Sequence, residues 1–233
     1  MSFAKLESVK CACGHEFEVE LLNSICVGEN PELKDALLCG EINIVQCPNC
    51  KSIFYAEQFL FYQESARELV AFVYPESFKD NAQRLALNMR GTFEQAVGAI
   101  DEENKINYEP ILIFGLDSLV EIVRLEDDIK DETEILRYYA DEIGVSTIEL
   151  SWAYARENKI VPLLPLKNTK SVLQRTSVID GIKTLLDKNP NLENYRKTLS
   201  KIEMDTNWNF DQSKIKKNIR LQLRKGFSER KGT

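Results

Sequence analysis

Cys11-Ala12-Cys13-Gly14-His15 and Cys47-Pro48-Asn49-Cys50 are the two stretches that decide the fold of the N-terminal half. Each brings two thiols close together along the chain, and two such pairs supply the four sulfurs of the tetrahedral site that Zn²⁺ prefers. Pro48 fixes one backbone torsion of the second turn, and Gly14 frees the backbone after the first pair. The sequence therefore predicts a structural zinc site whose ligands are Cys11, Cys13, Cys47 and Cys50.

Other interpretations of these thiols stay open. A catalytic zinc usually keeps one coordination position for water, whereas four thiolates fill all positions, so the structural role is favoured. Cys-Pro-Asn-Cys also has the spacing of a redox dithiol. The first pair is one residue shorter than the usual Cys-x-x-Cys, so His15, the only histidine, could replace Cys11 as a ligand. Packing of His15 beside the turn is the favoured alternative.

Strand and helix signals follow the first turn. Apolar Phe17, Val19 and Leu21 alternate with glutamates and predict a strand over 16–21. Asn30-Pro31 is typical of a helix start, and Gly40 suits the left-handed residue that ends a helix. Further strands are expected over 42–45, 52–56, 59–63 and 68–74, with a turn at 63–67.

Three segments resemble the bacterial CpXC family, which is named for its paired Cys-Pro-x-Cys motifs. They are residues 13–20 (Cys-Gly-His-Glu-Phe-Glu-Val-Glu), 30–34 (Asn-Pro-Glu-Leu-Lys) and 40–50 (Gly-Glu-Ile-Asn-Ile-Val-Gln-Cys-Pro-Asn-Cys). Residues 111–116 and 119–123 are similar to the family's later strand and helix, so the resemblance covers about 10–140. It implies a bound zinc and a cytoplasmic bacterial protein, and it implies no established activity. Lys10 stands where the family's first thiol usually falls, so Cys11 is shifted by one.

The later chain alternates helical and strand signals. Apolar spacings of three and four predict a helix over 78–100, and the apolar run 111–114 predicts a central strand. Helices are expected from Ser118, and again from Asp131 or Thr133 to Ile143. A hairpin is expected from 148–154 and 160–166. The acidic residues are expected to form a solvated helix end rather than a cation site; they are Glu126, Asp127, Asp128, Asp131 and Glu132.

The C-terminal segment is basic although the chain is acidic. The net charge is −7, yet eight basic residues and one acidic residue lie between Lys214 and Lys231. Spacings over 172–186, 192–202 and 215–227 are helical, and the last range predicts a basic amphipathic helix. It could dock on the protein's own acidic body, contact an acidic protein, or contact nucleic-acid phosphates; an anionic membrane surface is the less favoured alternative, because the segment has few large apolar residues. The residues considered for nucleic acid are Lys214, Lys216, Lys217, Arg220, Arg224 and Lys225.

Composition narrows the class of protein. No apolar run approaches membrane-spanning length, and residues 1–7 lack the apolar core of a signal peptide, so a soluble cytoplasmic protein with no membrane partner is expected. In a reducing compartment, thiols stay free or bind metal. A single histidine beside the thiols argues against common hydrolase chemistry.

Together these features predict an α+β fold with two parts. Residues 1–166 are expected to form a zinc-ribbon-like, β-rich domain with packed helices, and residues 167–233 an α-helical region with the basic tail. The expected function is a non-enzymatic adaptor or regulatory protein in which zinc shapes the surface and the helical region contacts a partner protein. A nucleic-acid-binding accessory factor is the alternative, and an enzyme of unknown chemistry is the third.

Overall fold

The computed structural model describes residues 2–98, 106–167, 174–209 and 211–218. The chain divides into two compact units, Met1–Arg124 and Leu125–Thr233. The boundary expected after residue 166 lies inside the second unit, between β9 (Leu163–Leu166) and α5 (Arg175–Lys188). Strands and helices are both present in quantity, so the α+β fold class is confirmed.

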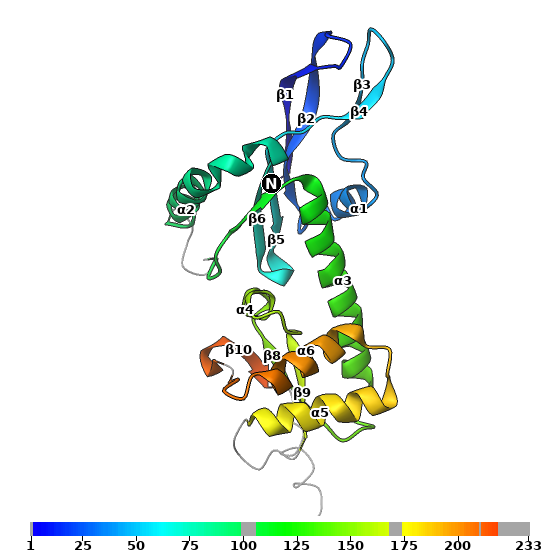
Figure 1. The fold of residues 1–233 in the computed structure, drawn as a ribbon, viewed down its shortest axis with the longest axis vertical. Coiled ribbons are helices and arrows are strands. Elements are labelled where there is room, and N and C mark those ends of the chain that lie inside the picture. Colours follow the sequence, from blue (N-terminus) through cyan, green and yellow to red (C-terminus); the bar gives the residue numbers. More distant parts are fainter. Residues whose placement is uncertain (1, 99–105, 168–173, 210, 219–233) are drawn as a thin grey trace, which may run out of the picture. The chain divides into compact units, whose positions relative to one another are not determined.

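The first unit is built on a five-stranded mixed sheet in the order β1-β2-β5-β6-β7 (Figure 1). The pairs β1–β2 and β5–β6 are antiparallel, and the pairs β2–β5 and β6–β7 are parallel. Its strands are β1 (Phe3–Lys10), β2 (Glu16–Cys26), β5 (Leu60–Glu64), β6 (Leu69–Tyr74) and β7 (Ile111–Phe114). A short 3-10 turn, Ser65–Arg67, joins β5 to β6, as expected.

The prediction that residues 111–114 form a central strand is wrong, because β7 lies at an edge of the sheet. Its run of apolar residues has a different cause. Ile111 and Ile113 pack into one core, and Leu112 packs into another, so both faces of this edge strand are covered.

Helices lie on both faces of this sheet. Figure 1 shows α2 (Ala82–Gly98) on one side of β5 and β6, with α1 (Glu32–Leu38) and the first half of α3 (Leu116–Tyr139) on the other. Leu37, Leu119 and Val123 are fully buried on the α1–α3 side, while Met89 of α2 packs with Phe72 on the opposite side. A 3-10 segment, Glu76–Asn81, precedes α2, and residues 99–100 of the expected helix lie outside the described residues.

The two helices expected between residues 118 and 143 are one continuous helix, α3. Thr133 lies inside this helix and does not begin a new one; its Oγ1 donates to the carbonyl oxygen of Lys130, in the preceding turn, at 2.7 Å. The expectation of a solvated acidic end is also wrong for Glu126 and Glu132. Glu126 is buried and ion-paired with Arg156 at 2.6 Å, and Glu132 binds the start of α6 (Glu193–Met204).

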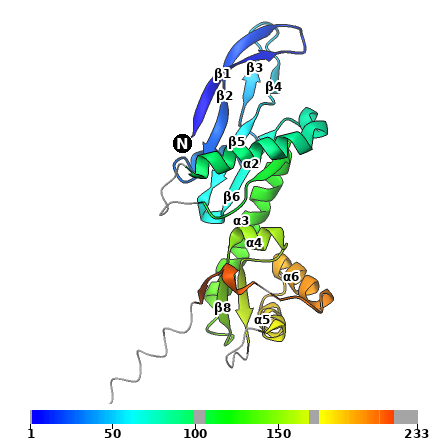
Figure 2. The same cartoon turned by 90° about the vertical axis from the view of Figure 1, so that its left-hand side faces the viewer.

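A second hairpin, β3 (Ile44–Gln46) and β4 (Ile53–Tyr55), packs against the β1–β2 pair (Figure 2). Leu21 and Val45 are buried between the two hairpins, with Phe17 and Phe54 in edge-to-face contact. Asn43 joins the hairpins through its side chain, which accepts from the N–H of Leu22 at 2.8 Å and donates to the carbonyl of the same residue at 3.0 Å. These contacts hold the turns of the two hairpins side by side.

The second unit contains a three-stranded sheet in the order β10-β8-β9. The expected hairpin is confirmed as β8 (Ser146–Leu150) paired antiparallel with β9 (Leu163–Leu166). Trp152 and Tyr154, which were expected in its first strand, lie instead in a short helix, α4 (Trp152–Glu157). Ser151 caps that helix, because its Oγ accepts the N–H of Tyr154 at 3.3 Å.

Helices α5 (Arg175–Lys188) and α6 (Glu193–Met204) pack with this sheet and confirm two of the three expected C-terminal helices. The expected basic helix is wrong for residues 215–218. They form β10 (Ile215–Asn218), which follows a 3-10 turn, Gln212–Lys214, and pairs antiparallel with β8. Residues 219–227 of that expected helix, with Arg220, Arg224 and Lys225, lie outside the described residues.

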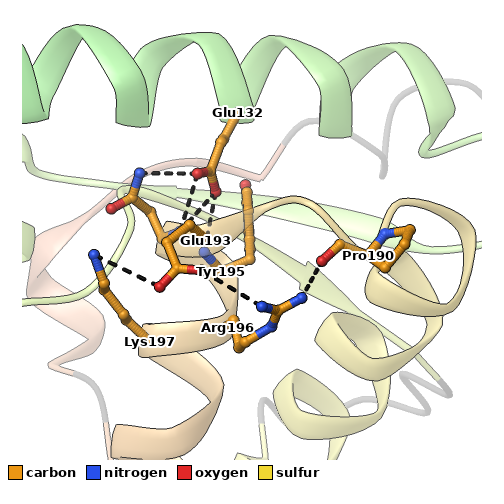
Figure 3. Close-up of polar contacts among 7 residues, drawn as sticks. Glu132, Pro190, Glu193, Tyr195, Arg196 and Lys197 are labelled. Carbon is orange, nitrogen blue, oxygen red and sulfur yellow. Dashed lines mark hydrogen bonds and ion pairs between the residues drawn. The ribbon is translucent and has the colours of Figure 1, made fainter.

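The core of the second unit is closed by polar contacts to α6 (Figure 3). The hydroxyl of Tyr195, which is fully buried, donates to the carbonyl oxygen of Leu163 in β9 at 2.7 Å. Glu132 of α3 accepts from the first N–H groups of α6. None of the helices in the described residues combines the length and apolar character needed to span a lipid bilayer.

Candidate metal centre

The first pair of thiols lies in the turn between β1 and β2. Backbone hydrogen bonds close this turn: the N–H of Cys11 donates to the carbonyl of His15 at 2.9 Å, and the N–H of Gly14 donates to the carbonyl of Cys11 at 2.8 Å. Gly14 has φ +87°, a conformation that residues with a Cβ rarely adopt. The glycine therefore allows the tight bend that turns both sulfurs to one side.

The second pair lies in the turn between β3 and β4. The N–H of Cys47 donates to the carbonyl of Ser52 at 2.9 Å, and the N–H of Lys51 donates to the carbonyl of Cys47 at 3.0 Å. Lys51 has φ +64° and takes the place that Gly14 has in the first turn. The two turns thus have the same backbone geometry, in which a residue with positive φ follows the second cysteine of the pair.

The four sulfurs that the sequence predicts as ligands lie together. All four Sγ atoms are within 4.8 Å of one another, with 3.6 Å between Cys11 and Cys50 and 3.8 Å between Cys13 and Cys47. A tetrahedron with Zn–S bonds of about 2.3 Å has sulfurs about 3.8 Å apart. The number, chemistry and spacing of these donors therefore fit a tetrahedral zinc ion, and they fit a closed site with no position left over.

A model of the CpXC protein family matches residues 9–137. The chain belongs to the CpXC family. The match includes all four cysteines of the site and ends within α3, near its last residue. Comparisons with curated proteins and with solved structures gave no match.

The shortened first motif left open whether Cys11 or His15 joins the other three sulfurs in this CpXC protein. The structure brings Cys11, and not His15, to the other three sulfurs. The imidazole of His15 is exposed and stacks on the ring of Phe17, with centroids 6.0 Å apart and planes inclined by 16°. Cys26 and Cys39 lie outside the group.

Hydrogen bonds to the sulfurs prepare part of this CpXC site for ionisation. The Cys50 thiol donates to Ser52 Oγ at 3.3 Å, and the bond reverses when the sulfur is ionised. The hydroxyl and then the backbone N–H of Ser52 lower the pKa of Cys50 to about 6. The backbone N–H of His15 is the main cause that lowers the pKa of Cys13. Thiolates are the form that binds metal, so both effects favour binding.

Cys11 behaves in the opposite way. The backbone N–H of Cys13 lowers its pKa, but burial and the neighbouring thiols outweigh this and raise the pKa of Cys11 to about 12. Four adjacent thiols cannot all lose their protons at neutral pH because the thiolates repel one another. A divalent cation removes that repulsion, so the cluster as a whole is suited to a positive ion.

Burial differs across the CpXC site. Cys11 and Cys47 are buried, whereas Cys13 and Cys50 are exposed. The exposed side also carries Asn49, whose Nδ2 lies 3.8 Å from the Cys13 sulfur. The site is therefore open to solvent at two of its four sulfurs and closed at the other two.

Sequence reasoning missed Asn49, Ser52 and Asn43 as residues that support the site. The first two have a local signal, since polar residues inside or just after a Cys-x-x-Cys turn are placed to donate to its sulfurs. Asn43 has no local signal, because its partner Leu22 is 21 residues away along the chain.

The basic residues predicted to contact nucleic acid are only partly described. Lys214 and Lys216 are exposed, beside and within β10. The side chain of Lys217 and all of Arg220, Arg224 and Lys225 lie outside the described residues. A phosphate-binding surface from these residues stays a sequence-based prediction.

Proposed function

We propose that this CpXC protein is a non-enzymatic adaptor or regulatory protein of the bacterial cytoplasm. In this function Zn²⁺, bound by Cys11, Cys13, Cys47 and Cys50, holds two hairpins together, and one of them presents a surface to a partner protein. Four thiolates complete the coordination of zinc, so the site supports a structural role better than a catalytic one.

The observation that carries the proposal is an exposed apolar face on the β3–β4 hairpin. Ile44 is 46% exposed and Ile53 is 68% exposed. In the register of the hairpin, Ile44 lies opposite Tyr55 and Ile53 opposite Gln46, so both isoleucines are on one face. The other face carries Val45, which is buried against β2.

This outer face depends on the metal centre for its shape. Cys47 directly follows β3, and Cys50 comes shortly before β4, so a metal ion bound in this turn fixes the register of the hairpin. Exposed isoleucines on a rigid two-stranded element form a small apolar surface of the kind that binds another protein. Zinc would then contribute to binding without contacting the partner.

The test is a pulldown from the native host with three forms of the full chain: the wild type, the double variant Ile44→Ser/Ile53→Ser, and Leu87→Ser. Leu87, on α2, is 71% exposed and serves as the matched control for loss of an exposed apolar side chain. A specific partner should bind the wild type and Leu87→Ser, and should be lost with the double variant. Equal zinc content in the three proteins would exclude damage to the metal centre.

The captured protein must then bind in purified form. A dissociation constant at least tenfold weaker for the double variant than for Leu87→Ser supports the proposal. Equal binding of all three proteins contradicts it. Copurified nucleic acid whose affinity falls steeply with salt would replace it with the nucleic-acid-binding function.

A further inference from the structure

Strand β1 forms one edge of the five-stranded sheet and is exposed along most of its length. It pairs with β2 from Phe3 to Lys10, and within the described part of the chain no strand pairs with its outer edge (Figure 2). Phe3 is 55% exposed and Leu6 is 56% exposed. An edge strand presents unpaired N–H and C=O groups that can accept another strand.

The side chains of β1 alternate between two faces. Lys5 and Glu7 lie on the same face, as their ion pair of 3.2 Å shows. Alternation along β1 assigns Phe3 and Val9 to that face, although the pairing with β2 shifts register between Phe3 and Ala4. Leu6 lies on the other face, opposite Glu20 of β2. The strand therefore has one face with two charges between two apolar residues, and a second face with a leucine at its middle.

A two-fold axis limits how this strand could pair with itself. Antiparallel pairing of two identical strands needs an axis perpendicular to the sheet, so each residue meets one from the same face of the second copy. One residue must then lie on the axis and meet itself. Only a few registers are available to an eight-residue strand, and each is defined by that central residue.

The charges select one of these registers. With Lys5 or Glu7 at the centre, like charges meet directly, which is destabilising. With Ala4 or Ser8 at the centre, neither Lys5 nor Glu7 meets an opposite charge: Phe3 meets Lys5 in the first register, and Leu6 meets Lys10 in the second. With Leu6 at the centre, Lys5 meets Glu7 of the second copy in both directions, Leu6 meets Leu6, and Phe3 meets Val9.

We propose that β1 pairs antiparallel with β1 of a second copy of this chain, with Leu6 on the two-fold axis. The pairing joins two five-stranded sheets into one continuous sheet and covers the exposed parts of Phe3 and Leu6. Charged residues on an edge strand normally prevent pairing. Here they are compensated in one register only, so Lys5 and Glu7 choose the partner and its alignment.

Charge exchange tests this register. In the full chain, Lys5→Glu places two acidic pairs across the axis, and Glu7→Lys places two basic pairs. Each variant should weaken the dimer roughly tenfold or more in sedimentation experiments at about 1–100 µM, the range suited to small interfaces. An equimolar mixture of the two variants pairs every acid with a base, and it should recover wild-type association as a heterodimer.

The double variant Lys5→Glu/Glu7→Lys should recover a homodimer for the same reason. Circular dichroism and metal content should stay unchanged in all variants, because Lys5 is 67% exposed and Glu7, at 24%, is only partly buried. A wild type that is monomeric at all these concentrations overturns the proposal. So does a dimer that is unaffected by the single variants, or a mixture that does not recover association.

A cysteine on the axis gives an independent test. Leu6→Cys places two thiols directly opposite, with Cβ atoms about 5 Å apart, and mild oxidation by oxidised glutathione should link two chains through position 6. Ser8→Cys is the matched control, because two residues at position 8 would lie about 14 Å apart in this register. Mass spectrometry identifies the linked peptide. Linkage at position 8 but not at 6 would overturn the register.

Discussion

Glu132 and Asn194 are joined by three hydrogen bonds although they are 62 residues apart along the chain (Figure 3). The backbone N–H of Asn194 donates to both carboxylate oxygens, at 2.9 and 3.0 Å, and its side-chain amide donates to one of them at 2.9 Å. The N–H of Tyr195 donates to the same carboxylate at 3.1 Å. Leu192, at the N-cap of α6, has no polar side chain, so a residue of α3 performs the capping.

Replacing Glu132 by alanine should therefore destabilise the second unit. The change removes the negative charge at the start of α6 and leaves two backbone N–H groups without their acceptor. We expect a loss of about 1–3 kcal/mol in the free energy of unfolding, measured with urea. Glu134→Ala is the control, since Glu134 is 62% exposed and contacts only its helical neighbour Arg137 among the ion pairs of the described residues. Equal losses for both variants would contradict the capping role.

Because of Tyr195, the free energy of unfolding should fall at alkaline pH. Burial is the main cause that raises the pKa of its hydroxyl well above the usual value, and the charge of Glu132 adds to it. The folded state then holds this proton more tightly than the unfolded state. The stabilisation that protonated Tyr195 gives the folded state is complete below the usual pKa of tyrosine in an unfolded chain, about 10, and it is lost as the pH rises above that value.

Tyr195→Phe removes the titrating group. We expect about 1 kcal/mol less stability at neutral pH, because the carbonyl of Leu163 loses its donor, and a smaller decline of stability above pH 10 than in the wild type. Urea unfolding at several pH values measures both. An unchanged alkaline decline would show that other groups cause it.

Gly181 of α5 is needed for the close approach of this helix to β9. A Cβ at this position would lie 2.3 Å from the carbonyl oxygen of Pro165 and 2.9 Å from the nitrogen of Leu166. Gly181→Ala should cost about 3 kcal/mol or more, because the obstacle is backbone and cannot rotate away. Gly91→Ala is the control. A Cβ at this helical position would meet no neighbouring atom within 4 Å, so the free energy of unfolding should rise by about 0.5–1 kcal/mol. Similar effects of the two changes in thermal unfolding would refute the contact.

Removing the metal should unfold the paired hairpins of the first unit. A structural zinc site of this type contributes on the order of 10 kcal/mol, and the small core between the hairpins gives little to replace it. We expect one zinc per chain by elemental analysis after purification without chelators, and a large drop in melting temperature after chelation. Cys47→Ser should lose the zinc, while Cys39→Ser, outside the cluster, should keep it. Protein without stoichiometric metal would refute a structural zinc.

The features predicted correctly from the sequence have local causes. The two thiol turns contain their own bending residues, Gly14 and Pro48, and the strand from Phe17 to Leu21 has one buried and one exposed face. Strand β1 was not predicted because it is exposed on both faces for most of its length, so it lacks the alternation that marks a half-buried strand.

Features set by distant partners were also missed. Ile215 and Ile219 have helical spacing, but Ile215 pairs with Leu150, which no local pattern indicates. The roles of Glu126 and Glu132 likewise depend on Arg156 and on α6. At the candidate metal centre, the grouping of the four cysteines was predicted from their spacing, whereas the role of Asn43 depends on Leu22, a partner distant along the chain.

Both cysteine pairs precede β5, β6 and β7 along the chain, and Cys13 and Cys47 are only 34 residues apart. These thiols leave the ribosome before the strands that complete the sheet do, so an ion bound by them would close this loop first. The order of assembly would then run from the metal outward. Without the ion, the two hairpins would lack this early constraint when the later strands emerge to complete the sheet.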